Sequence, residues 1–456
     1  MTTWHLTLGL TGLALLGATL APSLDALPPH AGPAPSADPP APSGAVQVSV
    51  AADRHEVAVG RLEERFVTVT LDPVAQDVAA VDRPLDLALA LDVSGSMAGD
   101  GKLDQAVRAA RHVARALRPQ DRLTVVTFSN AASVLAADAP GRSVLRALDG
   151  LLPGGGTNLY DGLDAAFQAT QGPPDGRLRR VILLSDGQAT TGRTDDASIL
   201  GLAREAQAHG VSVSAVGLGL DFHEDLMAGV SDAGGGSYAF VDLRSDLTRV
   251  FASELDRSAR LVARQAVLDL HLAPGVDAIE LVGWEGARTA DGWRVPLGDL
   301  YGGEARKVVL RVRTRAEVPG STPLAHAALA FVDVQTERPA QAQADLAVEA
   351  TASVARADAS VNAPAAAQAQ RAWGARLLDL ASRAYARGES DEALELLDAS
   401  QEAVQELEQL GYADLAAEDD AVLRAQEEVY RSVDADSFGG KEAIKRAKEA
   451  SRAKAR

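Results

Sequence analysis

A largely apolar run, Leu85–Leu91, leads without a break into the polar motif Asp92-Val93-Ser94-Gly95-Ser96. A run of this kind predicts a strand that is covered on both faces, as in a parallel sheet between two layers of helices. Side chains two positions apart on an extended backbone point the same way, so the oxygens of Asp92, Ser94 and Ser96 can face one point. The run and the motif together predict an α/β fold with a polar site at the end of one strand.

Two segments further along the chain supply oxygens of the same kind. Thr157 follows Gly154–Gly156, a loop flexible enough to bring its hydroxyl close to another group. Asp186 follows a second apolar run, Val181–Leu184, and precedes Gly187, a common strand-to-loop break. In open α/β sheets, ligands bind beyond the carboxyl ends of the strands, and both segments fit that location. The residues predicted to share one site are therefore Asp92, Ser94, Ser96, Thr157 and Asp186.

This donor set contains two carboxylates and three neutral hydroxyls, which suits a hard divalent cation. Mg²⁺ accepts one or two carboxylates, keeps several waters and leaves a position for an outside oxygen, unlike a dedicated Ca²⁺ cage. We therefore expect Mg²⁺, with Mn²⁺ or Ca²⁺ as alternatives. An ion held by so little negative charge stays electron-poor and should attract an anionic ligand atom, such as a carboxylate of a partner protein.

The three segments together resemble the metal-ion-dependent adhesion site of the von Willebrand factor type A (VWA) domain. The resemblance extends over about residues 82–258 and is closer to multi-domain bacterial members than to integrin I domains. It rests on Asp92-x-Ser94-x-Ser96, Gly155-Gly156-Thr157-Asn158-Leu159 and Leu183-Leu184-Ser185-Asp186-Gly187. It implies direct metal binding by Ser94, Ser96 and often Thr157. Asp92 and Asp186 are implied to bind the metal directly or through water.

The wider pattern predicts several structural units. Residues 82–260 alternate apolar runs with helical stripes, which indicates a doubly wound, Rossmann-like α/β domain. The resemblance implies that this domain is of the VWA type. Residues 45–81 and 261–352 alternate apolar and polar positions, which is typical of strands with one buried face. A few strands alone are marginally stable, so we expect the two groups to pair. The α/β domain would then be inserted in, or flanked by, one β-sandwich; two separate small β units are the alternative.

The beginning of the chain predicts export. Leu6–Leu20 is apolar, too short for a comfortable membrane span, and suited to the core of a signal peptide. No Lys or Arg precedes it, so residues 1–26 are interpreted as a signal peptide or an N-terminal anchor. Residues 27–44, rich in Pro and Ala, are interpreted as a linker. We expect an extracytoplasmic protein, periplasmic, surface-bound or secreted, that meets a membrane only through an uncleaved N-terminal segment.

The end of the chain predicts helices. Residues 365–435 carry apolar faces at helical spacing and read as a helical hairpin region, in which residues 384–393 resemble the turn of a tetratricopeptide hairpin. At least three such repeats are needed for a solenoid, so a packing hairpin is favoured over a peptide-binding array. Residues 436–456 form a basic tail that we expect to be solvated and poorly ordered rather than a binding arm.

Composition excludes several classes of function. The formal net charge of −19 argues against non-specific binding to nucleic acid and against attraction to anionic lipid. The chain contains no cysteine, so disulfides, thiol nucleophiles and thiolate zinc sites are ruled out. Gly217-Leu218-Gly219 lacks the third glycine of a dinucleotide loop, and no His-Glu-x-x-His motif occurs. We therefore expect neither a dinucleotide cofactor nor an enzyme.

Two main functions remain open on the sequence, and a third, a metal hydrolase, is disfavoured because no general base is evident. The leading hypothesis is a non-enzymatic, adhesion-type module in which Mg²⁺ captures an Asp or Glu side chain of a partner protein. The family resemblance further implies that the last helix of the domain, Asp246–Arg260, shifts between two affinity states. The alternative is an assembly scaffold in which the metal is structural and the C-terminal helices bind the partner.

Overall fold

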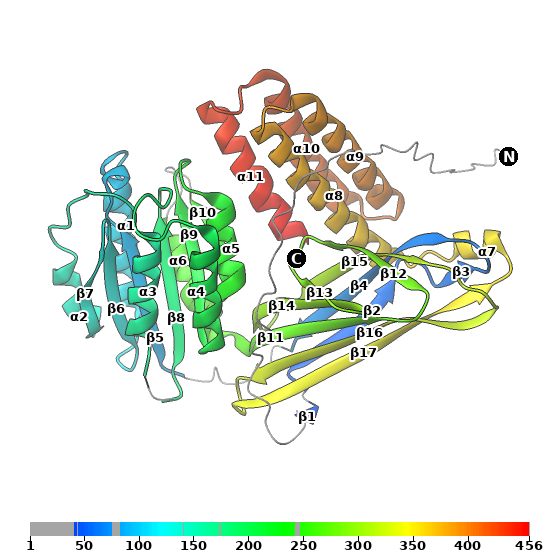
Figure 1. Ribbon diagram of the computed structural model, residues 1–456, viewed down its shortest axis with the longest axis horizontal. Coiled ribbons are helices and arrows are strands. Elements are labelled where there is room, and N and C mark those ends of the chain that lie inside the picture. Colours follow the sequence, from blue (N-terminus) through cyan, green and yellow to red (C-terminus); the bar gives the residue numbers. More distant parts are fainter. Residues whose placement is uncertain are drawn as a thin grey trace.

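The computed structural model describes residues 41–42, 44–74, 83–139, 141–172, 175–241 and 247–455. An α/β domain lies at one end, two β-sheets lie beside it, and a group of helices lies against both (Figure 1). The predicted signal peptide, residues 1–26, and most of the predicted linker, residues 27–44, lie outside the described residues. In the described part of the chain, none of the helices has both the length and the apolar character that a membrane span requires.

The α/β domain is built on a six-stranded sheet. Its strands are β5 (Leu85–Asp92), β6 (Arg122–Phe128), β7 (Ala132–Ala139), β8 (Leu178–Ser185), β9 (Val211–Leu218) and β10 (Gly235–Val241). Their order is β10-β9-β8-β5-β6-β7, and only the edge strand β7 runs antiparallel to its neighbour. The chain moves outward from β5 to β7 and then returns to the other side of β5 with β8. The order therefore reverses between β5 and β8, where sheets of this type bind ligands.

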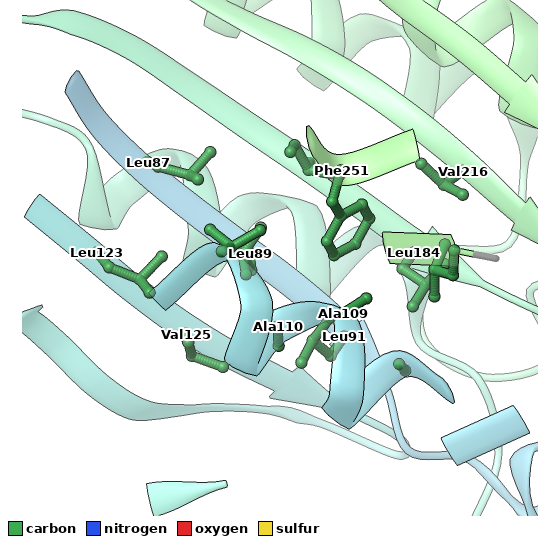
Figure 2. Packing of buried hydrophobic residues seen from close by; sticks show 14 of the residues in the cluster. Leu87, Leu89, Leu91, Ala109, Ala110, Leu123, Val125, Leu184, Val216 and Phe251 are labelled. Atoms are coloured by element: carbon green, nitrogen blue, oxygen red, sulfur yellow. The ribbon is translucent and has the colours of Figure 1, made fainter. Parts of the chain in front are cut away.

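Alternate residues of each strand enter two different cores. The helices on the two faces are α1 (Lys102–Ala116), α2 (Gly141–Ala147) and α6 (Leu247–Ala259) on one, and α3 (Leu159–Ala169), α4 (Asp196–Ala208) and α5 (Glu224–Gly234) on the other. Leu89 and Leu91 of β5 belong to the first core, where Phe251 of α6 points toward the strand (Figure 2). Ala88 and Ala90 belong to the second core. Because both faces are buried, the central strands are largely apolar.

Strands from before and after the α/β domain share a four-stranded sheet. Its members are β2 (Val46–Ala52), β4 (Glu63–Pro73), β12 (Val276–Val282) and β15 (Arg306–Thr314). β4 lies between β2 and β15, and the β4–β15 register pairs Leu71 with Arg306 and Glu63 with Thr314. These pairs join segments on opposite sides of the α/β domain, so the chain leaves this sheet and later returns to it.

A seven-stranded sheet completes the β part of the molecule. Its members are β1 (Ala41–Pro42), β3 (Glu56–Ala58), β11 (Leu261–Leu272), β13 (Ala287–Arg288), β14 (Gly292–Tyr301), β16 (Gly320–Asp333) and β17 (Arg338–Thr351). The order is β1-β17-β16-β11-β14-β13, with β3 also paired to β17. Val67 and Val69 of β4 share one hydrophobic cluster with Leu268 and Leu270 of β11, so the two sheets have a common core.

The C-terminal part contains more helices than a hairpin. After the short α7 (Val354–Ala359) come α8 (Ala363–Ala386), α9 (Ser390–Gln409), α10 (Ala413–Ser432) and α11 (Phe438–Ala455). All four long helices contribute to one apolar core. α8 also covers the outer face of the four-stranded sheet, where the rings of Trp373 and Phe66 lie 6.2 Å apart between centroids. The predicted hairpin region, residues 365–435, is therefore three helices, of which the first anchors the group to the sheet.

The prediction of a solvated, poorly ordered tail for residues 436–456 is wrong. α11 forms in this segment and packs against α8 and the α/β domain (Figure 1). Lys448 Nζ lies 2.8 Å from Asp225 Oδ1, and Arg452 Nη2 lies 2.7 Å from Asp232 Oδ1, both on α5. Lys445 Nζ lies 3.5 Å from the centre of the Phe222 ring. The basic residues pair with acidic residues of the same chain, and these ion pairs hold the segment in place.

Candidate metal centre

The ends of β5 and β8 lie side by side where the strand order reverses. Leu91 and Leu184 are partners in parallel register, so Asp92 and Ser185 follow them at neighbouring positions. The side chains of Asp92 and Asp186 are both fully buried. The two predicted carboxylates thus lie beyond the carboxyl ends of the central strands, at the base of the loops that follow.

Short contacts connect the serine motif to Asp186. Ser94 Oγ lies 2.9 Å from Ser96 Oγ, and Ser96 Oγ donates a hydrogen bond to Asp186 Oδ1 at 2.6 Å. Ser94 is buried, whereas Ser96 is exposed. Of these side-chain oxygens, those of Ser94 and Asp186 are buried, and that of Ser96 lies at the surface, where a ligand from solvent can reach it.

Thr157 reaches the same point from a third segment. A methyl group placed on Gly187 would lie 3.3 Å from Ser96 Oγ and 3.5 Å from Thr157 Oγ1. Both hydroxyls therefore flank the same backbone atom, and the absence of a side chain at Gly187 keeps the space between them open. The structure brings all five residues predicted from the sequence together in one place.

The glycine loop that carries Thr157 is fastened to the serine motif. Gly95 N donates to Gly155 O at 3.0 Å, and Gly154 N donates to Val93 O at 2.8 Å. Gly155 has a φ of 82°, and a side chain there would come within 2.9 Å of the Asn130 amide. Glycine is required at this position for both backbone conformation and space. The loop is thus held in place by backbone hydrogen bonds rather than left flexible.

Asp92 is fully engaged by the protein. Its Oδ1 accepts a hydrogen bond from Ser94 N at 2.8 Å, and its Oδ2 accepts one from Ser185 Oγ at 2.6 Å. Burial raises the pKa of Asp92, while these hydrogen bonds from Ser185 and Ser94 act in the opposite direction. The structure therefore gives Asp92 the role of holding the serine motif and placing negative charge beneath the hydroxyls. Ser185 was not assigned a role from the sequence.

Sequence reasoning also missed a cation in the site. Lys102 Nζ donates to Asp186 Oδ2 at 2.6 Å, and Lys102 is only 6% exposed. A side chain on Gly219 would come within 3.3 Å of Lys102 Cε, so the loop after β9 packs on the lysine stem. Lys102 opens α1, and a cation at the start of a helix opposes the helix dipole. A lysine at this position of a predicted helix is therefore a feature of the sequence that could have indicated a nearby anionic partner.

The assembled residues fit a small divalent cation. Three hydroxyls and two carboxylates converge, and one ammonium offsets one of the two negative charges. Within the described residues, no group of three or more His, Cys, Asp and Glu side chains could hold a metal, so the hydroxyls would have to supply ligands. Neutral oxygens with few carboxylates are the donors that Mg²⁺ accepts while it keeps its own waters.

Comparison with known proteins identifies the α/β domain. Residues 87–188, which include both carboxylates and all three hydroxyls, match the family model of the von Willebrand factor type A domain. The chain contains a VWA domain. Two solved structures show that most of the remaining fold is shared as well.

The VWA protein from Catenulispora acidiphila aligns with a TM-score of 0.64 at 17% identity, covering 85% of this chain and 91% of that chain. The ArnB paralog VWA2 from Sulfolobus acidocaldarius aligns with a TM-score of 0.59 at 16% identity, covering 90% and 99%. At such identities the likeness concerns the fold alone. The predicted VWA-type fold is confirmed by these neighbours, whereas the completeness of its metal site remains a prediction.

Curated relatives are similar over part of their length. The uncharacterized protein YfbK of Escherichia coli K12 is 28% identical over 239 residues, which are 51% of this chain and 42% of that protein. The uncharacterized protein sll0103 of Synechocystis is 26% identical over 276 residues, or 58% of this chain and 64% of that protein. The chain thus spans less than two thirds of the length of either relative.

Proposed function

We propose that the chain is a metal-dependent protein-binding module in which Mg²⁺ at the VWA site captures an acidic side chain of a partner. VWA domains generally mediate protein–protein interaction, and this chain contains one. The observation that carries the proposal is the continuous contact from Ser94 through Ser96 to Asp186, with Thr157 beside it. It places several hydroxyls over buried negative charge, next to solvent.

The charge balance favours an anionic ligand. Ser94, Ser96 and Thr157 would bind the ion through their hydroxyls, while Asp92 and Asp186 supply negative charge directly or through water. Lys102 already offsets one carboxylate, so a bound dication would give the whole cluster one net positive charge. A carboxylate from an Asp or Glu of the partner neutralises that charge and fills an open coordination position. Mn²⁺ or Ca²⁺ could occupy the same donors.

We further propose that the module is not an enzyme. Each carboxylate of the site already accepts hydrogen bonds, Asp92 from Ser94 N and Ser185 Oγ and Asp186 from Ser96 Oγ and Lys102 Nζ. Hydrogen bonds and a neighbouring ammonium stabilise the ionised form of these carboxylates, which makes them weak bases toward a substrate proton. His223, at the start of α5, lies instead with Nδ1 3.8 Å from Asp196 Oδ1.

We also propose that the module lies outside the cytoplasm, because the apolar segment Leu6–Leu20 suits the core of a signal peptide. We also interpret the two β-sheets as one sandwich into which the VWA domain is inserted. The pairing of β4 with β15 and the core shared by the two sheets support this interpretation. The edge of the VWA sheet that carries the metal site would then be supported by this sandwich.

Calorimetric titration with Mg²⁺ tests the site. Wild type should bind, and Asp92→Ala should not. Because Asp92 also supports the fold, Ser96→Ala provides a milder variant that removes one exposed hydroxyl and should weaken binding. The matched control is Asp149→Ala, which removes a carboxylate that is 66% exposed and pairs with Arg111. Equal heats from wild type, Asp92→Ala and Ser96→Ala would remove the site.

A pull-down from the native cell envelope tests partner capture. The full chain should retain a protein in Mg²⁺ that is released by chelator, and Asp186→Ala should retain none of it. Restoring Mg²⁺ after chelation should restore capture. Proteins retained equally with and without the metal do not use this site.

The scaffold alternative has one supporting observation. The side of α9 away from the helical core is acidic, with Glu395, Asp398 and Glu402 all exposed. Deleting residues 365–456 would not test it cleanly, because α8 covers Val282 and Val309 of the sheet. Neutralising the three acids with Gln and Asn leaves the packing intact. If partner capture is lost in that variant but survives Asp186→Ala, the scaffold function replaces the proposed one.

A further inference from the structure

Two histidines stand opposite each other on the outer face of the seven-stranded sheet. β11 and β16 are antiparallel, and His271 is the register partner of His326. Their chain neighbours Leu270 and Ala327 belong to the hydrophobic core, so both histidines project from the opposite face. The ring centroids lie 6.1 Å apart, and the ring planes are inclined by 31°. The two side chains are 44% and 37% exposed, so solvent reaches them.

Each ring is oriented by its own carboxylate. His271 Nδ1 lies 2.9 Å from Asp291 Oδ2, and His326 Nδ1 lies 2.7 Å from Asp345 Oδ1. A carboxylate can only accept, so each Nδ1 carries a proton and each neutral ring keeps the lone pair of Nε2. The hydrogen bond from His271 also holds the pKa of Asp291 below its usual range. A carboxylate on the far nitrogen is the usual partner of a metal-binding histidine, whose tautomer it fixes.

The neighbours on the same face leave the two rings accessible. Asp269, two residues before His271, is held by Arg294, whose Nε and Nη2 lie 2.7 and 2.9 Å from its carboxylate oxygens. Ala328 stands opposite Asp269 in the register. One neighbouring charge is therefore already paired, and the other neighbour is too small to cover the rings.

We propose that His271 and His326 form a second metal site, which takes a divalent transition ion of the Zn²⁺, Ni²⁺ or Cu²⁺ kind. Imidazole nitrogen suits these ions, whereas Mg²⁺ prefers oxygen, so this site and the VWA site select different metals. With Zn–N bonds of about 2.0–2.1 Å, two histidine rings on one ion have centroids roughly 5–6 Å apart, close to the separation here.

Two protein nitrogens leave coordination positions open. Asp291 and Asp345 bind the far sides of the rings and act as positioning residues, consistent with the lack of a three-ligand cluster in the described part of the chain. Water would fill the remaining positions, so the ion binds reversibly and stays open to a ligand from another molecule. Affinity should rise from Zn²⁺ or Ni²⁺ to Cu²⁺.

The test is calorimetric titration of the full chain with Zn²⁺ in saturating Mg²⁺, which keeps the VWA site occupied. Wild type should bind one Zn²⁺, and His326→Gln should lose at least about tenfold in affinity. Asp345→Ala should weaken binding by about tenfold, because it removes the group that orients the ring. The matched control is His112→Gln, which removes an exposed histidine from α1 and should change nothing. No binding to wild type, or equal binding to wild type and His326→Gln, overturns the proposal.

Two further measurements separate this site from the VWA site and from a loss of folding. Zn²⁺ binding must survive Ser96→Ala, and its disappearance there would assign the ion to the VWA site instead. Nitrogen NMR on histidine-labelled protein should show protonated Nδ1 in both rings before metal is added. Zn²⁺ should then shift both Nε2 resonances together. A shift in only one ring, or a protonated Nε2 in the metal-free protein, contradicts a shared ion.

Discussion

Lys102 sets the charge of the VWA site before any ion binds. Its ammonium is buried and donates to Asp186 Oδ2 at 2.6 Å, so it stabilises a carboxylate that water does not reach. A buried charge without a partner is far more costly than one within a hydrogen-bonded pair. A divalent cation near Asp186 would compensate the same charge. The lysine and the proposed ion would therefore be partly redundant for folding, whereas capture of an outside ligand would need the ion.

Replacing this lysine should make folding depend on metal. Lys102→Met should lower the free energy of unfolding by about 3 kcal/mol in chelator, because it leaves Asp186 buried without its cation. Much of that loss should return in Mg²⁺. Denaturant unfolding followed with and without Mg²⁺ measures both effects, and Lys102→Arg serves as the charge-preserving control. An equal loss in the two conditions would show that no ion compensates Asp186.

Asp53 gives the stability of the molecule a dependence on pH. Burial raises the pKa of Asp53 to about 6, although the nearby Arg65 and Arg54 lower it. Its Oδ1 accepts no hydrogen bond. Because its pKa is higher in the folded state, the folded protein binds this proton more tightly than the unfolded chain does. The resulting stabilisation is complete below about pH 4 and is lost as the pH rises through 6.

Asp53→Asn should therefore help only near neutral pH. At pH 7 it should add about 2–3 kcal/mol to the free energy of unfolding, and at pH 4 it should add only about 0.5 kcal/mol. Thermal unfolding of both proteins from pH 4 to pH 7.5 measures the difference. Asp72→Asn, at an exposed position of β4, should show no such trend. The same gain at both ends of the pH range would mean that the effect comes from packing rather than from the proton.

The five predicted site residues could be read from the sequence because of their motif spacing and because two of the three segments follow apolar strands. The run Leu85–Leu91 places Asp92 at the end of β5, whereas Ser96 lies in the short 3₁₀ helix Gly95–Ala98, which strand alternation does not predict. The roles of Ser185 and Lys102 depend on which atoms of Asp92 and Asp186 remain available. That depends on side-chain geometry, which spacing along the chain does not determine.

Among the helices, α11 shows that the sequence can predict a basic helix face but cannot predict which surface of the molecule that face contacts. Its basic residues recur three or four positions apart and therefore share one side of the helix. The acidic residues they meet lie in the VWA domain, with Lys448 and Asp225 separated by 223 positions in the chain. The pairs are Lys441–Asp221, Lys445–Glu224, Lys448–Asp225 and Arg452–Asp232. A basic run far from an acidic one reads as a solvated tail, because only the folded chain brings the two together.

Exchanging one of these pairs should test the contact. Arg452→Asp places two carboxylates together and should cost about 1 kcal/mol, since the pair is partly exposed. The visible result should be faster hydrogen exchange in α11 and α5. Adding Asp232→Arg to the same protein should restore protection. Arg446→Asp is the control, because Arg446 bonds Glu442 within α11. Failure of the double exchange to restore protection would show that apolar packing alone holds the helix.

α6, the last helix of the VWA domain, makes contacts that oppose the expected sliding between two affinity states. Its Glu254 accepts hydrogen bonds from Ser214 of β9, at 2.8 Å, and from Ser237 of β10. α6 ends at Ala259 and is followed by β11, which starts at Leu261, so the helix has little slack before the next sheet. A shift between two affinity states stays a prediction, and it would have to break these buried hydrogen bonds.

At the scale of the whole molecule, the hydrophobic pattern of the sequence predicted the individual structural units better than the contacts between them. Continuous apolar runs alternating with helical stripes indicated a doubly wound α/β domain, and alternating apolar and polar positions indicated strands on both sides of it. The helical period around residues 365–435 could not reveal how α8 docks. α8 is rich in alanine on several sides, so no single apolar stripe marks its buried face. Docking surfaces built from small residues depend on shape, which periodicity does not record.

A buried cation joins the VWA domain to the seven-stranded sheet. Arg180 of β8 donates to Tyr301 Oη at 2.7 Å and to Asp299 Oδ2 at 3.5 Å, both on β14. Its Nη1 also lies 4.0 Å from Glu254 Oε2 on α6. Burial raises the pKa of Asp299, and the charge of Arg180 opposes that rise. Separating the two units would break the contacts of Arg180 with Tyr301 and Asp299, so the network favours unfolding of the two units as one.

Calorimetry on Arg180→Met should show whether this cation makes the two units cooperative. Wild type should unfold the VWA domain and the sheets in a single transition. The variant should split that transition and lose about 3 kcal/mol, because the buried Asp299 loses the cation of Arg180. Arg179→Met is the matched control, since Arg179 bonds Gly172 O inside the VWA domain and should leave one transition. If both variants keep one transition, the covalent path through α6 and β11 couples the units instead. A partner pulling on the metal site would then transmit force through the backbone rather than through the buried network.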